Sequence, residues 1–328
     1  MKIGQTRGVP IWLQLLVLIA GALHAVTSFF FFSRGRRGAA WALAWTIATI
    51  ATIAAGDRAG VQAVFWGAVL VWRIWWVSLR PRLDRDWAPD VARQATGTIT
   101  GEQLVVQNVR NFEWRSDDDF DERWETRTYD LDRLESIDLF ACTWNTTAIA
   151  HIIVSFGFEG QGQLAFSIEI RRPRDEPWSG VGGFFKVFEL VTIVADERDV
   201  VRVRTNVRGE DVRLYRLRST PAFRRRLLAA YLADCDRLAT TPRFFHTILT
   251  NCATQVIRLV RAAGQGLPFD WRMILTGYIP EYLHRVGLLD ARPFAVLHLL
   301  GGISGHAKLV GDRPDFSAAI REGVPRPE

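Results

Sequence analysis

Three long apolar stretches fill the first 80 residues and constrain this chain more than any other feature. Residues 11–32 and 39–56 contain no charged side chain, and residues 61–79 contain only Arg73. A helix needs roughly 20 apolar residues to cross a bilayer, so each stretch is long enough to span one. Arg73 lies toward the end of its stretch, from where its side chain can extend to the interface. The pattern predicts a transmembrane region over residues 1–80 with three helices and excludes a purely soluble protein.

Features of the first and third stretches bear on their roles. The first is longer than the apolar core of a signal peptide, about 7–15 residues, and no clear Ala-x-Ala site follows it, so we expect it to be retained. His24 within it is expected to pack against a neighbouring helix rather than to mark a proton path. Trp72, Trp75 and Trp76 suit the interfacial belt at one membrane surface.

The charges around the spans predict an orientation. With three spans, the N-terminus and the large domain lie on opposite sides of the membrane. The domain side carries more basic residues (Arg34, Arg36, Arg37, Arg80, Arg82, Arg85) than the other side (Lys2, Arg7, Arg58). The positive-inside rule therefore favours a cytoplasmic domain.

Composition limits what the rest of the chain can be. The chain is 48% hydrophobic with a formal net charge of +6, which argues against disorder. Its basic residues are nearly all Arg, and no nucleic-acid motif is present, so membrane lipids are the expected partner and nucleic acid is not. Cys142, Cys235 and Cys252 form no CxxC pair, which excludes a disulfide framework and makes structural zinc unexpected.

Residues 81–95 read as a polar linker, and residues 96–328 as one α+β domain. The clearest strands are 149–158 and 164–171, which a Gly-containing loop joins as a hairpin. Further strands are predicted at 103–109, 200–205 and 212–218. Helices are predicted from Thr220, which can cap Pro221, from Cys252 to Ala263, and over 280–286.

Cys252 is the residue whose position most favours chemistry. Thr250 and Asn251 are good N-cap residues, so Cys252 lies at a helix start, where backbone N–H groups and the helix dipole stabilise a thiolate. His151 begins the clear hairpin and is the best candidate base. If the turn centres near Gly160, Glu169 lies nearly opposite His151 and could orient the imidazole. The alternatives stay open: such a Cys is often simply packed, and such a His is often structural.

Other motifs do not point to a cofactor or a metal. The acidic residues Asp117, Asp118, Asp119, Asp121 and Glu122 lack the EF-hand pattern, so a solvated loop is expected there. The Arg224–Arg226 run reads as a solvated face or a headgroup contact, and Cys235 as a buried, inert thiol. No phosphate-binding loop, GxSxG elbow or HExxH motif occurs.

Seven blocks in order resemble the Lnb N-terminal periplasmic domain family over roughly residues 84–325. They are Asp86–Val91, Asn108–Phe112, Trp124–Tyr129, His151–Phe158, Ser167–Arg171, Val194–Val200 and Thr250–Thr254. The resemblance implies a permuted, papain-like (NlpC-type) fold with an antiparallel sheet packed against helices. It also implies Cys252 as nucleophile, His151 as base, and Glu169 or a neighbour as the orienting group.

The resemblance further implies a domain on the periplasmic side of the bacterial inner membrane, against the preference of the loop charges, and we follow the resemblance. The family's best-known activity is acyl transfer to lipoproteins through an acyl-thioester. The expected function is thus a cysteine-dependent acyltransferase or hydrolase acting on lipoprotein, lipid or cell-wall acyl or amide bonds. A non-catalytic, membrane-tethered scaffold and a cell-wall peptidase or amidase are the alternatives. The oligomeric state does not follow from the sequence.

Overall fold

The computed structural model describes residues 10–32 and 35–327, so Lys2, Arg7 and Arg34 of the charge argument lie outside the described residues. The chain forms two compact units. One contains the residues up to Arg82 together with Glu176–Val187, and the other contains Leu83–Asp175 and Phe188–Glu328. The segment 176–187 therefore leaves the globular domain between two of its strands and joins the N-terminal unit.

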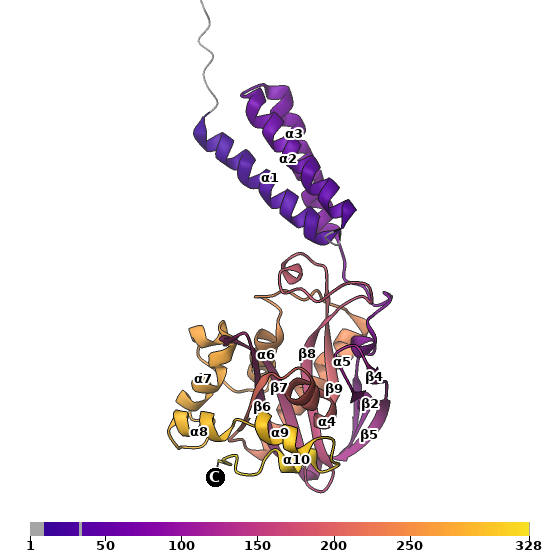
Figure 1. Cartoon of the computed structure of the whole chain (residues 1–328), viewed down its shortest axis with the longest axis vertical. Coiled ribbons are helices and arrows are strands. Elements are labelled where there is room, and N and C mark those ends of the chain that lie inside the picture. The colour runs from indigo at the N-terminus through magenta and orange to yellow at the C-terminus, as the bar shows by residue number, and fades with distance from the viewer. Residues whose placement is uncertain (1–9, 33–34, 328) are drawn as a thin grey trace, which may run out of the picture. The chain divides into compact units, whose positions relative to one another are not determined.

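The N-terminal unit consists of three helices, α1 (Ile11–Phe31), α2 (Arg36–Ala55) and α3 (Ala59–Ser78) (Figure 1). All three are long and apolar enough to cross a membrane, which confirms the three predicted stretches. Helices α1 and α2 approach closely at Gly21, where a Cβ atom would lie 1.7 Å from Thr49 Oγ1. The His24 ring packs 4.7 Å from the Trp45 ring, as the packing interpretation expects.

The globular domain is built on one large mixed sheet with the strand order β1-β2-β9-β8-β7-β6-β10, and β5 pairs with β2. The strands are β1 (Thr96–Thr100), β2 (Gln103–Arg110), β5 (Trp124–Asp130), β6 (Leu134–Trp144), β7 (Thr146–Phe158), β8 (Gly162–Arg171), β9 (Glu189–Ala195) and β10 (Asp211–Arg216). A separate pair, β3 (Glu113–Trp114) and β4 (Phe120–Asp121), holds the acidic loop. The predicted sheet was antiparallel; the observed one is mixed because β2 runs parallel to β9 at Arg110 and Ala195.

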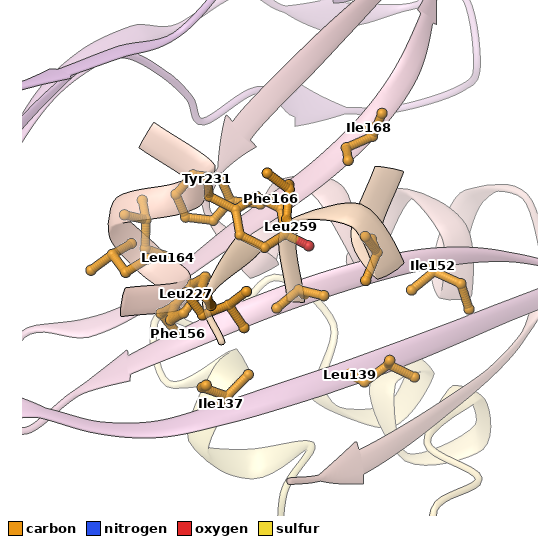
Figure 2. Close-up of a cluster of buried hydrophobic side chains, with 14 of the residues drawn as sticks. Ile137, Leu139, Ile152, Phe156, Leu164, Phe166, Ile168, Leu227, Tyr231 and Leu259 are labelled. Carbon is orange, nitrogen blue, oxygen red and sulfur yellow. The ribbon is translucent and has the colours of Figure 1, made fainter. Parts of the chain in front are cut away.

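Helices cover both faces of the sheet. They are α4 (Glu197–Val200), α5 (Pro221–Thr240), α6 (Cys252–Ala262), α7 (Ile279–Arg285), α8 (Phe294–Leu300), α9 (Ser304–Val310) and α10 (Phe316–Ala319). Along β7, Ile152, Val154 and Phe156 join the core under α5 and α6, whereas Ile153 joins the core under α4, α9 and α10. Figure 2 shows the first of these cores, with Tyr231 of α5 and Leu259 of α6 among side chains of β6, β7 and β8. Burial of both faces explains why β7 reads as a continuous apolar run.

Several sequence predictions are confirmed. The 149–158 and 164–171 hairpin is β7 and β8, and the 103–109 and 212–218 strands are β2 and β10. Thr220 caps α5, since its side chain accepts a hydrogen bond from the Phe223 N–H. Cys235 of α5 is fully buried. The helix predicted from Cys252 to Ala263 is α6, and the one predicted over 280–286 is α7.

The strand predicted at residues 200–205 is wrong. This segment ends α4 and continues as a π-helical turn, η4 (Val203–Val207). The alternation of Val and Arg resembles a half-exposed strand, but Val200, Val201 and Val203 are all buried. Asp196, whose side chain accepts from the Arg198 N–H, starts a helix here instead.

The predicted linker 81–95 is only partly a linker. Trp87, Ala88 and Val91 are buried, and a short 3₁₀ turn covers Pro89–Val91. Trp87 pairs with Pro173 next to the end of β8, and the Arg171 guanidinium lies 4.5 Å from the Trp87 ring centroid. The chain therefore joins the domain from Trp87 onward.

Candidate functional site

The hairpin β7–β8 brings His151 and Glu169 together. Its ladder pairs Phe158 with Gly162 and continues to Ile153 opposite Ser167, so the turn centres on Gly160. Two residues further along the same register, His151 faces Glu169. Beyond Ile153 and Ser167 the two strands stop pairing with each other: β7 stays paired with β6, and β8 stays paired with β9. The sheet is therefore open between His151 and Glu169.

A short chain of polar contacts connects the two side chains. His151 Nε2 lies 2.7 Å from Ser167 Oγ, and Ser167 Oγ donates to Glu169 Oε1 at 2.7 Å. Since the serine proton goes to the carboxylate, the serine oxygen is the acceptor for the His151 Nε2 proton. Glu169 Oε1 also lies 3.2 Å from His151 Nε2 directly. These contacts hold the ring through Nε2.

Arg204 of the η4 turn completes the polar cluster, and the sequence analysis missed it. Its Nη2 donates to Glu169 Oε1 at 3.0 Å, and its Nη1 forms an ion pair of 3.1 Å with Glu210. The arginine side chain is only 6% exposed. π-helical turns are rare and occur often at functional sites, but the alternation of Val and Arg around Arg204 predicts a strand, so no local sequence signal marks this residue.

Cys252 is the first residue of α6, as predicted. Asn251 and Thr254 form a capping box: Asn251 Oδ1 accepts from the Thr254 N–H at 2.9 Å, and Thr254 Oγ1 accepts from the Asn251 N–H at 3.0 Å. Cys252 lies close enough to the His151 ring and to the backbone of Ile152, in the strand next to the opening, for both to lower the pKa of its thiol. The structure thus brings together Cys252, His151 and Glu169.

The charges of the cluster act on one another. Burial alone would raise the pKa of Cys252, but the hydrogen bond from His151 and the positive charge of that ring lower it overall. Burial and the Arg204 charge would lower the pKa of His151, but Glu169 and Cys252 raise it to about 9. Burial opposes the charge on Glu169, whereas His151 and Arg204 hold its pKa well below the usual range. The arrangement favours a thiolate beside an imidazolium.

The other two cysteines differ from Cys252. Cys142 lies directly opposite His151 in the β6–β7 ladder, and Cys235 lies in α5. Both are fully buried, and burial raises the pKa of each thiol. Cys252 is the partly exposed cysteine among the described residues, so it is the thiol that a reagent can reach.

The remaining candidates of the sequence analysis are used elsewhere in the fold. Asp119 and Asp121 pair with Arg115, and Asp117 pairs with Arg208. The Arg224–Arg226 run contacts the domain itself, because Arg224 donates to Leu134 O, Arg225 pairs with Asp132, and Arg226 donates to Ala263 O. Over residues 10–32 and 35–327, no cluster of three or more His, Cys, Asp or Glu side chains is placed to hold a metal ion.

The fold and this site define a class: a membrane-anchored α+β protein whose sheet carries a histidine against a helix-start cysteine. Residues 120–277 match the family model described as the Lnb N-terminal periplasmic domain, and the globular domain belongs to that family. The matched region includes His151, Glu169, Arg204 and Cys252. The family description and the three apolar helices together indicate a periplasmic-facing membrane protein. No curated protein and no solved structure matches the chain.

Proposed function

We propose that this protein is a thiol enzyme that acts on acyl or amide bonds at the periplasmic face of the bacterial inner membrane. Cys252 is the nucleophile, His151 the acid and base, and Glu169 the group that orients His151. One observation carries the proposal: His151, whose Nε2 is held by Ser167 and Glu169, lies close enough to Cys252 at the start of α6 for each group to shift the pKa of the other. Cysteine-based acyl transfer requires a nucleophile next to a base and a group, such as a carboxylate, that orients the base.

The first chemical step follows from the charges of the resting site. The Cys252 thiolate attacks the substrate carbonyl carbon, an S–C bond forms, and the carbonyl π electrons move to oxygen. Two N–H groups at the start of α6, those of Cys252 and Ala253, precede the N–H that Asn251 caps and have no intrahelical partner. They are the groups that can hold the oxyanion.

The second step returns the enzyme to its resting state. When the oxyanion collapses, the bond to the leaving group breaks and the leaving group takes the proton of the His151 imidazolium. The neutral imidazole then accepts a proton from water or an amine as that molecule attacks the thioester. Expulsion of the thiolate restores the ion pair.

The order of the residues supports a permuted papain-like arrangement. The strand with His151 comes before the helix with Cys252 in the chain, and that helix packs against one face of the sheet. Membrane anchoring favours a lipid or lipoprotein acyl substrate, and cell-wall peptide is the other acyl substrate within reach.

Labelling with a thiol-reactive acyl probe tests the nucleophile. We expect the full chain to be labelled, C252A to lose the label, and C235A to keep it, because Cys235 is buried in α5. Equal labelling of C252A and the parent chain would overturn the enzyme proposal and leave a tethered, non-catalytic module.

The orientation has its own test, because the charges flanking the spans favour the opposite side. Large domains can cross regardless of those charges. Fusion of alkaline phosphatase to the C-terminus should give active phosphatase, which needs the periplasm. Fluorescence from a reporter that matures only in the cytoplasm would overturn the periplasmic assignment.

A further inference from the structure

The segment Glu176–Val187 leaves the sheet between β8 and β9 and belongs to the same compact unit as the three apolar helices. Its only regular element is a 3₁₀ turn at Gly182–Phe184. Three large apolar side chains of this segment face outward: Trp178 is 61% exposed, Val181 50% and Phe184 37%. A stretch this apolar and this exposed requires a covering surface.

Two contacts fix where the segment meets the helices. The Phe185 ring stacks on the Phe30 ring with 5.1 Å between centroids and 8° between planes. Lys186 Nζ donates to Trp76 O at 2.8 Å and lies 5.6 Å from the Trp76 ring centroid. Phe30 belongs to the last turn of α1 and Trp76 to the last turn of α3. Because α1 and α3 run in the same direction through a three-helix unit, both residues mark the same end of the spans.

That end has the composition of a membrane interface. Phe31 packs against Trp75 and Trp76, and Phe32 stacks on Trp41 and Trp75. Aromatic belts of this kind lie at the level of lipid headgroups. Basic residues accompany them: the positive charges of Arg80 and Arg73 act on Lys186. Cations beside aromatic rings suit the boundary between phosphates and acyl chains.

We propose that residues 176–187 form a membrane-contacting loop that places Trp178, Val181 and Phe184 in the headgroup and upper acyl region of the bilayer, beside the ends of α1 and α3. The occupant of the apolar face is lipid because the loop packs on Phe30 and Trp76, at the ends of two helices that are long and apolar enough to cross a membrane, so the loop continues their apolar surface. This inference is separate from the thiol chemistry and holds whether or not Cys252 turns over a substrate.

Depth measurement in a bilayer tests the loop directly. The full chain with C252A is placed as single copies in nanodiscs of neutral and anionic phosphatidyl lipids, and a nitroxide is attached at V181C. A matched label at E159C lies in the exposed polar β7–β8 turn. We expect the Val181 label to be relaxed mainly by lipid-soluble oxygen and the Glu159 label mainly by a water-soluble nickel chelate.

Each other outcome overturns the proposal. If the Val181 label is relaxed by the nickel chelate as strongly as the Glu159 label, the loop lies in water. If neither reagent reaches the Val181 label, protein covers the loop instead of lipid. A second label at W178C, also on an exposed side chain, must give the same result as V181C. Because C252A is the background, failure here says nothing about the proposed nucleophile.

Discussion

Arg204 Nη2 and Glu169 Oε1 form a partly buried ion pair of 3.0 Å, and the same carboxylate oxygen contacts Ser167 and His151. Glu169 Oε1 therefore lies in contact with an arginine guanidinium, a serine hydroxyl and an imidazole ring. Arg204 is itself held by Glu210. The position of Glu169 relative to His151 thus depends on the η4 turn, which lies far along the chain from the hairpin.

Removal of Arg204 should destabilise the domain strongly. R204M leaves Glu169 and Glu210 without their shared cation; the pair with Glu210 is buried on both sides, and breaking a buried ion pair by removal of one partner costs about 3–5 kcal/mol. We expect a clear fall in the thermal midpoint of the detergent-solubilised chain. The control is R115M, because Arg115 pairs with Asp119 and Asp121 at the surface; its midpoint should hardly move. Equal midpoints for R204M and R115M would contradict the argument.

The reactivity of Cys252 should depend on pH in a way that an ordinary thiol does not. Its pKa is lowered from 9, whereas that of His151 is raised to about 9, so the thiolate is present across the range between the two values. Alkylation by iodoacetamide should therefore reach its plateau at a lower pH than for an ordinary thiol and decrease as the pH falls through the pKa of Cys252.

The H151Q variant is the comparison for the pH dependence of Cys252 alkylation. It removes the positive charge beside the sulfur, so the pKa of Cys252 should rise and the thiolate fraction at pH 7 should fall. The rate is followed by mass spectrometry of the peptide containing Cys252. Superimposable profiles for the parent chain and H151Q would show that the ring does not act on the thiol.

Thr276 should stabilise the start of the strand that carries His151. Its Oγ1 accepts from the Ala150 N–H and donates to Ala150 O, both at 2.7 Å. T276V keeps the shape and removes both hydrogen bonds, which should cost about 1–3 kcal/mol and slow the alkylation of Cys252. T276S retains the hydroxyl and should behave like the parent chain. The idea fails if T276V and T276S unfold at the same temperature.

The contact between α1 and α2 should tolerate no side chain at Gly21. A Cβ atom there would lie 1.7 Å from Thr49 Oγ1 and 2.8 Å from Thr49 Cβ, so the helices would have to separate. We expect G21A to lower the midpoint of helix loss measured by circular dichroism in detergent. G67A is the matched change in α3, where no atom lies within 4 Å of the added Cβ. A midpoint for G21A as high as that for G67A would refute the close approach.

The parts of the site that local patterns determine could be predicted. Residues Gly160 and Gly162 set the turn, the turn sets the register, and the register places Glu169 opposite His151. Asn251, one of the two predicted cap residues, sets the start of α6 and therefore the position of Cys252. Each of these inferences uses a sequence signal that lies in the same hairpin or at the same helix end as the residue whose position it predicts.

The parts that tertiary packing determines could not be predicted. The segment around Arg204 has the β-branched composition of a strand, but it is helical because Asp196 caps α4 and because Val200 and Val201 pack against α9 and α10. Pairing of β2 with β9 likewise depends on residues far apart in the chain, Arg110 and Ala195. Residues 176–187 leave the globular domain and contact Phe30 and Trp76. No local sequence pattern predicts these contacts.

The residue that caps the N-terminus of α6 is an asparagine, and an aspartate in its place could not make the same contacts. Either side chain can accept the Thr254 N–H, but only the amide can also donate to Thr247 O, which Asn251 Nδ2 does at 2.7 Å. An aspartate would in addition place a carboxylate one residue from a sulfur that has to carry negative charge. Because the asparagine cap is uncharged, the partial positive charge at the start of the helix is not neutralised by the cap and can stabilise the thiolate.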